Sequence, residues 1–159
     1  MTNKTFALAT IFVFAHIAFV APFVPSKNIL PAGFGALSMT SMALVLVLAA
    51  RWRLVDRILG GPDKSYGAHR WLGLFAIGGG LAHWALASPV GSGILPALAG
   101  GGRDAGLIAM LGLIVLTFAA MSRAIPYHIW KASHMLMGPL FLLAAFHTFF
   151  VASPLAVGA

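Results

Sequence analysis

The sequence predicts an all-α fold, a polytopic membrane helix bundle with five transmembrane helices that forms a single domain over residues 1–159. Hydrophobic residues make up 60% of the chain and charged residues 8%, and the mean hydropathy is +0.96. Soluble globular domains do not combine such values. The apolar residues also come in stretches of about 20, long enough for each stretch to cross a hydrocarbon layer of about 30 Å as a helix.

Breaks rich in proline, glycine and charge separate the predicted spans, which cover residues 5–23, 31–50, 68–88, 104–122 and 128–151. The first span resembles a secretory signal because Lys4 precedes it. No small-x-small cleavage motif follows it, so we expect this span to be retained.

Glycine and proline modify the two later spans. Gly100, Gly101 and Gly102 predict a turn ahead of the fourth span. Gly138 and Pro139 lie inside the fifth span. A proline there removes a backbone hydrogen bond, so we expect a kink or a rewound turn. The sequence gives no sign of an internal repeat or of a second, soluble domain.

The basic residues concentrate on one predicted side of the membrane. Only Lys27 and Arg103 fall on the other side. The positive-inside rule therefore places the N-terminus in the cytoplasm and the C-terminus outside, as in a bacterial-type inner membrane protein. This distribution also accounts for the formal charge of +7 without a nucleic-acid partner. The residues on the basic side are Lys4, Arg51, Arg53, Arg57, Lys64, Arg70, Arg123 and Lys131.

The residue types that are absent or rare exclude several kinds of chemistry. The chain has no cysteine, which excludes disulfides, thiolate catalysis and iron–sulfur clusters. Its three acidic residues fall in a connection or at the start of a span: Asp56, Asp63 and Asp104. No carboxylate is therefore expected at membrane depth, which argues against a carboxylate-based ion pump.

Four of the six histidines form two pairs within predicted spans. His69 and His83 are 14 residues apart in the third span, and His134 and His147 are 13 apart in the fifth. Because these spans run in the same direction, His69 and His134 share the cytoplasmic level, and His83 and His147 share the external level. A bis-histidine haem takes one imidazole from each of two facing helices. The sequence therefore predicts two haem irons held by these four histidines.

The helical phase supports one pair better than the other. At about 100° per residue, His83 returns to within about 40° of His69, whereas His147 lies about 140° from His134. The second pair therefore depends on the distortion expected at Pro139.

Residues near the histidines are candidates for secondary roles. Haem propionates favour basic partners, so we expect Arg70 and Lys131 beside the inner haem and Arg103 beside the outer one. The glycines at 78–80 leave a patch without side chains, suited either to a macrocycle or to close helix packing.

The two remaining histidines are weaker candidates. His128 lies next to Tyr127 at the start of the fifth span and is predicted to be interfacial. His16, alone in the first span, suits a helix contact, a hydrogen bond to a haem edge, or a quinone or metal site.

Two motifs surround the histidine pairs: Tyr66-Gly67-Ala68-His69-Arg70-Trp71-Leu72-Gly73 with His83, and Tyr127, Trp130 and His134 with His147. These motifs resemble the ferric reductase and NADPH oxidase transmembrane family over about residues 35–150. The resemblance implies that the four paired histidines ligate two b-type haems, which relay electrons from a cytoplasmic flavin to an external acceptor. Family members commonly have a sixth span, and many continue into a flavin- and nicotinamide-binding domain. Neither is recognisable here, so we expect the flavin, if any, on a separate reductase.

Three hypotheses for function remain open from the sequence. The first is the haem-carrying membrane subunit of an oxidoreductase, as in the stand-alone haem subunits of this family, with partner subunits and a separate flavin donor. The second is a quinol-linked membrane cytochrome b, which also sets paired histidines on two helices. The third is a non-catalytic membrane subunit that keeps the fold within a larger assembly. A metal-ion transporter that uses histidines alone is a more distant alternative.

Overall fold

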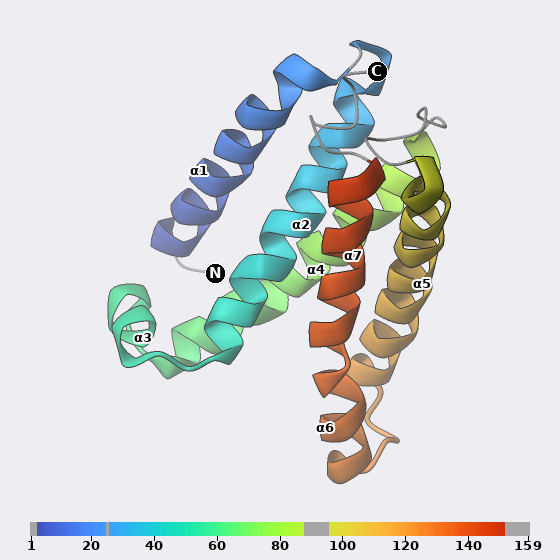
Figure 1. Ribbon diagram of the computed structural model, residues 1–159. Helices are drawn as coiled ribbons and strands as arrows, with labels where there is room; N and C mark the ends of the chain where they lie inside the picture. Colours follow the sequence, from blue (N-terminus) through green and yellow to red (C-terminus); the bar gives the residue numbers. More distant parts are fainter. Residues whose placement is uncertain (1–2, 25, 88–95, 152–159) are drawn as a thin grey trace. The chain divides into compact units, whose positions relative to one another are not determined.

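Every regular element in the described residues is a helix (Figure 1). The computed structural model describes residues 3–24, 26–87 and 96–151, which divide between two compact units, Met1–Ala87 and Ser88–Ala159. The first unit contains α1 (Asn3–Val20), α2 (Ile29–Ala49), α3 (Arg53–Leu59) and α4 (Pro62–Leu86), with the 3-10 turns η1 (Ala21–Phe23) and η2 (Ser26–Asn28) between α1 and α2. The second contains α5 (Pro96–Met121), α6 (Tyr127–Met135) and α7 (Met137–Val151). The single domain over residues 1–159 stays a prediction.

Three helical segments among the described residues are long and apolar enough to cross a membrane: Ile29–Ala49, Gly100–Met121 and Tyr127–Val151. They match the second, fourth and fifth predicted spans. The apolar part of α1, Phe6–Phe19, is shorter. Helix α4 has 25 residues but carries charge in its first turns, where it begins six residues before the predicted span. The count of five spans therefore stays a prediction.

The turn predicted at residues 100–102 is wrong, because these glycines lie within helix α5. Packing explains the difference. A Cβ atom added to Gly102 would lie 2.7 Å from Cγ2 of Val151 on α7. Glycine here lets the two helices approach closely. The glycine run in the sequence does not show that another helix packs against it.

Helix α3 is a further difference, since its residues were predicted only as a polar connection. It ends in a Schellman motif: Gly60 has φ of 93°, its N–H donates to Arg57 O at 3.3 Å, and the N–H of Gly61 donates to Asp56 O at 2.7 Å. Pro62 then occupies the first turn of α4, where a missing N–H has no cost. In the sequence, the Gly-Gly-Pro run at residues 60–62 was the signal for this helix boundary.

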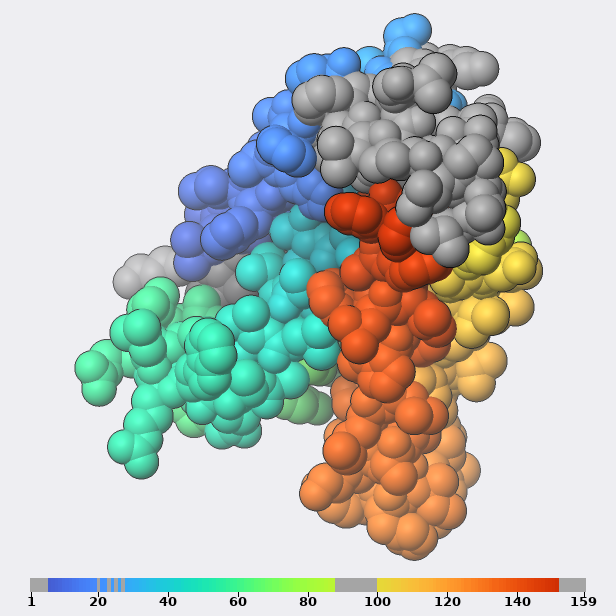
Figure 2. Space-filling model, in the orientation of Figure 1, coloured from blue at the N-terminus to red at the C-terminus, as the bar shows by residue number. Residues whose placement is uncertain are grey.

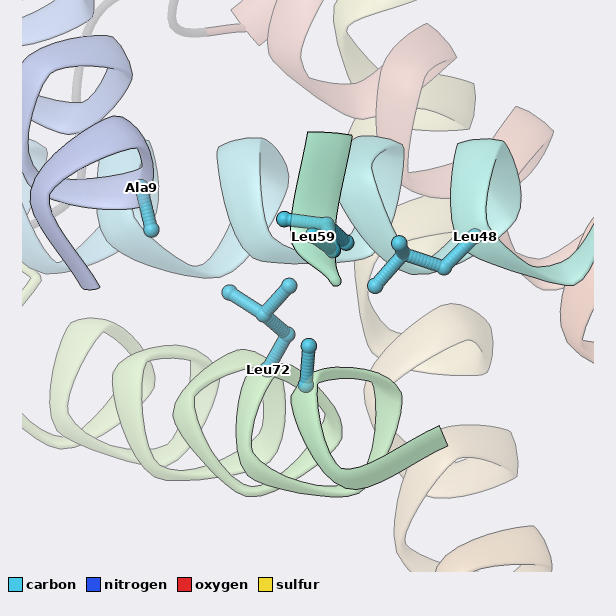
Figure 3. Close-up of a cluster of buried hydrophobic side chains, with 5 residues drawn as sticks. Ala9, Leu48, Leu59 and Leu72 are labelled. Atoms are coloured by element: carbon cyan, nitrogen blue, oxygen red, sulfur yellow. The ribbon is translucent and has the colours of Figure 1, made fainter. Parts of the chain in front are cut away.

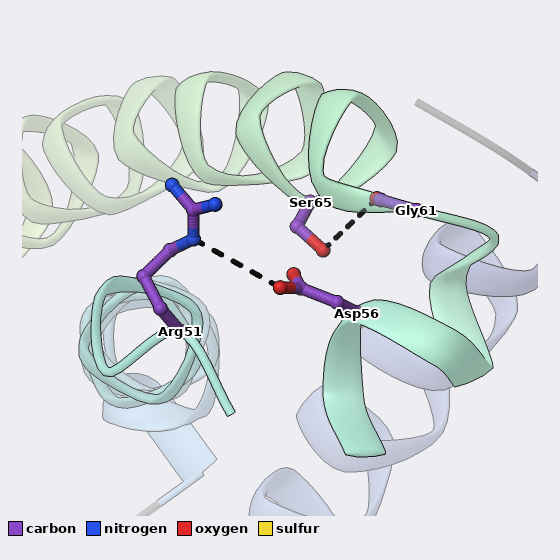
Figure 4. Close-up of polar contacts among 4 residues, drawn as sticks. All are labelled: Arg51, Asp56, Gly61 and Ser65. Carbon is purple, nitrogen blue, oxygen red and sulfur yellow. Dashed lines mark hydrogen bonds and ion pairs between the residues drawn. The ribbon is translucent and has the colours of Figure 1, made fainter. Parts of the chain in front are cut away.

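Polar contacts hold the connection around α3 (Figure 4). The Nε atom of Arg51 lies 3.9 Å from Oδ2 of Asp56, and the buried Ser65 hydroxyl donates to Gly61 O at 3.4 Å. The outer surface of α3 bears exposed basic and apolar side chains, and Figure 2 shows this helix on the outside of its unit.

A cluster of apolar side chains ties α3 to its neighbours within the first unit (Figure 3). Leu59 of α3 meets Leu72 of α4 and Leu48 of α2, and α1 contributes Ala9. Leu72 is only 2% exposed.

Helices α2 and α4 lie close together at Gly79. A Cβ atom added there would lie 2.9 Å from Phe34 O and 3.0 Å from the Ser38 backbone nitrogen. Next to this contact the Ser38 hydroxyl donates to Ala76 O at 2.7 Å. Of the two roles predicted for the glycines at 78–80, the structure assigns close helix packing to Gly79.

The fifth predicted span is interrupted at Leu136, between α6 and α7. Pro139 has no N–H to donate to the carbonyl of Met135, which is the last residue of α6. The N–H of Leu136 instead donates to Ser133 O at 3.0 Å, a shorter-range bond that tightens the turn. The structure thus confirms the interruption predicted from the Gly-Pro pair.

Candidate functional site

His83 lies near the end of α4, and its ring packs against the first turns of α2. Its Nδ1 atom lies 2.8 Å from Pro31 O. The ring also covers Gly35, where an added Cβ would lie 3.1 Å from the same nitrogen and 3.4 Å from Cε1. Two residues of α2, four positions apart, therefore fix the position of this imidazole.

His147 has the same arrangement in the second unit. Its Nδ1 atom lies 3.0 Å from Gly102 O in α5. A Cβ added to Gly106 would lie 2.5 Å from Nδ1 and 2.7 Å from Cγ. The carbonyl and the glycine are again four positions apart on the facing helix.

These hydrogen bonds determine the histidine tautomer. A backbone carbonyl can only accept, so Nδ1 must carry the proton in both His83 and His147. In the neutral imidazole the lone pair is then on Nε2. Histidines that ligate a metal commonly have this pattern, with one nitrogen donating to a carbonyl and the other facing the metal. The donor chemistry of these two residues therefore fits haem iron.

His134 of α6 is held by aromatic stacking. Its ring lies 5.2 Å from that of Trp130, at an interplanar angle of 12°. Trp130 stacks in turn on Tyr127, with centroids 5.6 Å apart and an angle of 27°. Because the three residues recur at helical spacing on one short helix, α6 presents a continuous stack that ends at the imidazole.

His69 lies in α4, half-buried, directly after Ala68, which is completely buried. The predicted pairing of His69 with His134, and of His83 with His147, joins residues of different units and stays a prediction. The structure places His83 against α2 and His147 against α5.

The predicted propionate partners are all exposed. Arg70 follows His69 on α4, Lys131 lies on α6 between Trp130 and His134, and Arg103 follows Gly102 on α5. Their role as propionate partners stays a prediction.

The two weaker histidine candidates differ in their surroundings. Nδ1 of His16 in α1 lies 3.0 Å from the Thr40 hydroxyl in α2, so of its predicted roles the helix contact is the one observed. His128 is exposed in the first turn of α6, as expected of an interfacial residue.

Sequence reasoning missed the residues that hold the histidines. Pro31, Gly35, Gly102 and Gly106 have no ionisable side chain and act through the backbone. The signal available in the sequence was a spacing of four residues, from Pro31 to Gly35 and from Gly102 to Gly106.

Comparison with known families gives a match. The model of the ferric reductase like transmembrane component matches residues 34–145, well over half of the chain. The matched stretch contains His69, His83 and His134, and His147 follows just after its end. A search of the curated proteins finds no match. With its apolar helices, the chain is a multi-pass membrane protein, and it belongs to the ferric reductase-like transmembrane family.

Proposed function

We propose that this chain is the haem-carrying membrane subunit of an oxidoreductase and that it transfers electrons across a bacterial-type inner membrane. Membership of the ferric reductase-like family supports transmembrane electron transfer as the activity. The observation that carries the haem assignment is the direction of the hydrogen bonds at His83 and His147, which leaves the Nε2 lone pair on both rings. Haem iron, when bound, supplies the one-electron redox change.

The four histidines have separate places in this proposal. His69 and His134 would hold the haem on the cytoplasmic side, and His83 and His147 would hold the one on the external side. Fourteen residues of α4 separate its two histidines by about 21 Å along the helix axis, which places one near each face of a hydrocarbon layer of about 30 Å. Arg70 and Lys131 would face the propionates of the inner haem, and Arg103 those of the outer one. The protein thus supplies position and electrostatics to both haems.

Haem content tests the ligand assignment. The purified wild-type chain is expected to hold two haems, measured as the pyridine adduct and as a reduced-minus-oxidised difference spectrum. His69→Ala, His83→Ala, His134→Ala and His147→Ala should each lose about half of the haem, because iron with one strong axial ligand is held weakly. His128→Ala is the matched control and should keep both haems. A wild-type chain without a Soret band, or four variants with unchanged haem content, would contradict the proposal.

The donor is tested on the same protein in proteoliposomes. We propose a separate flavin reductase on the cytoplasmic side as the donor, with reduced flavin as the probe. Haem reduction by reduced flavin in the absence of any quinol is the expected result. Reduction by a quinol alone, blocked by a quinone analogue, would instead support the quinol-linked alternative.

A further inference from the structure

We propose that Gly35 and Gly106 are equivalent positioning residues that each open a backbone carbonyl to a histidine ring. This inference rests on the proposed function, because the rings that they position are the external haem ligands of that proposal. In each unit the acceptor carbonyl belongs to the residue four positions before the glycine: Pro31 before Gly35, and Gly102 before Gly106.

Helix geometry explains why the glycine has to stand at that position. The carbonyl of residue i accepts the N–H of residue i+4 and keeps a second lone pair. Each Cα–Cβ bond tilts toward the helix N-terminus, so a side chain at i+4 lies beside the carbonyl of residue i. This is also how serine and threonine side chains reach that carbonyl. A glycine at i+4 leaves the approach open to an imidazole from another helix.

The distances show that the glycine position is occupied by the ring in both units. The ring atom nearest to an added Cβ is Nδ1 in both units, the nitrogen that donates the hydrogen bond. It would lie 3.1 Å from a Cβ added to Gly35 and 2.5 Å from one added to Gly106. Any β-carbon at Gly106 would therefore push the ring away from Gly102 O. The tighter contact predicts a larger effect at Gly106 than at Gly35.

The arrangement has a consequence for the iron ligand. A hydrogen bond from Nδ1 to a carbonyl fixes the ring orientation and makes Nε2 more basic. Both external ligands gain this bond, and they gain it from backbone atoms, which cannot rotate away as a side-chain acceptor can. Losing the bond should raise the reduction potential of the external haem, because a less basic ligand stabilises ferric iron less.

Glycines on the same two helices provide matched controls. An added Cβ at Gly33 of α2 makes only an ordinary contact, 3.9 Å from Cδ1 of Ile17, and one at Gly101 of α5 meets none of the described atoms within 4 Å. Gly35→Ala and Gly106→Ala should therefore be compared with Gly33→Ala and Gly101→Ala. All four variants make the same chemical change and gain the same helix propensity.

Two measurements test the proposal. In haem-free protein with ¹⁵N-labelled histidine, the ring nitrogen shifts of His83 and His147, assigned with the His83→Ala and His147→Ala spectra, should report the Nδ1–H tautomer. Gly106→Ala should lose this signature for His147, and Gly35→Ala should weaken it for His83. In haem-loaded protein the same two variants should raise the external haem potential or lower its occupancy severalfold, while both controls match the wild type.

The outcomes separate this inference from the proposed function. If the wild type binds no haem, the proposed function fails, and the nitrogen shifts still decide whether the glycines position the rings. If Gly106→Ala does not fold, Gly35→Ala and the wild-type tautomers decide. Wild-type rings without Nδ1–H, or Gly35→Ala and Gly106→Ala indistinguishable from Gly33→Ala and Gly101→Ala, would overturn the inference.

Discussion

At the scale of single residues, the histidines differ in how they are held. His83 and His147 are oriented by backbone carbonyls, whereas His134 lies against the face of Trp130. A hydrogen bond fixes both the tautomer and the ring plane. Stacking fixes the ring plane and leaves the choice of nitrogen to other contacts. The predicted inner and outer haems are therefore expected to differ in their spectra.

Trp130→Leu tests the contribution of stacking. The leucine keeps an apolar side chain on α6 but removes the parallel contact with His134, worth about 1 kcal/mol. We expect binding of the inner haem to weaken roughly fivefold, measured by titrating haem into the haem-free protein. Trp52→Leu, an exposed position in the α2–α3 connection, is the control and should bind haem as the wild type does. Equal affinities for the two variants would show that the stack has no role.

At the scale of helices, small residues decide how closely two helices pack. Ser38 and Gly79 bring the backbones of α2 and α4 together, and Gly102 and Gly106 do the same for α5 and α7. Membrane helices commonly pack in this way, since lipid offers no hydrophobic driving force between them and close backbone contact supplies the attraction. The positions of the histidine rings depend on this close packing.

Gly79→Ala and Gly78→Ala form a matched pair for the α2–α4 contact. The added methyl at Gly79 would lie 2.9 Å from Phe34 O, a backbone atom that moves only if the helices separate, whereas at Gly78 it meets none of the described atoms within 4 Å. We expect Gly79→Ala to lower the free energy of unfolding by about 1–3 kcal/mol. Gly78→Ala should be neutral or slightly stabilising, because alanine favours the helix. The free energies of unfolding of the two variants are measured in mixed detergent by circular dichroism. Equal values would contradict the packing assigned to Gly79.

At the scale of the whole molecule, membrane topology depends most on α4. This helix carries two of the four paired histidines, yet it is not among the strongly apolar helices that are long enough to span. If α4 crosses the membrane, its two ends lie on opposite sides, with the basic end in the cytoplasm. The proposed separation of the haems between the two faces requires this crossing.

Labelling of single cysteines tests the crossing, and the native chain, which has no cysteine, provides an unlabelled background. Asp63→Cys and Ala87→Cys place a thiol at exposed positions at the two ends of α4. A membrane-impermeant maleimide added to spheroplasts should label Ala87→Cys at once and Asp63→Cys only after lysis. Labelling of both from the same side would show that α4 does not span.

The helical class, the membrane environment and the interruption near Pro139 follow from the amino-acid sequence alone, and so does the spacing of the histidines within each predicted span. Each of these depends on local composition, on spacing along a helix or on the chemistry of one residue type. The tertiary structure alone decided that residues 100–102 continue a helix and that α3 forms in the connection. It also decided that Gly35 and Gly106 open backbone carbonyls to imidazoles. The physical reason is that a glycine has no side chain to signal its role, so whether it makes a turn or a close contact depends on which neighbouring helix packs against it.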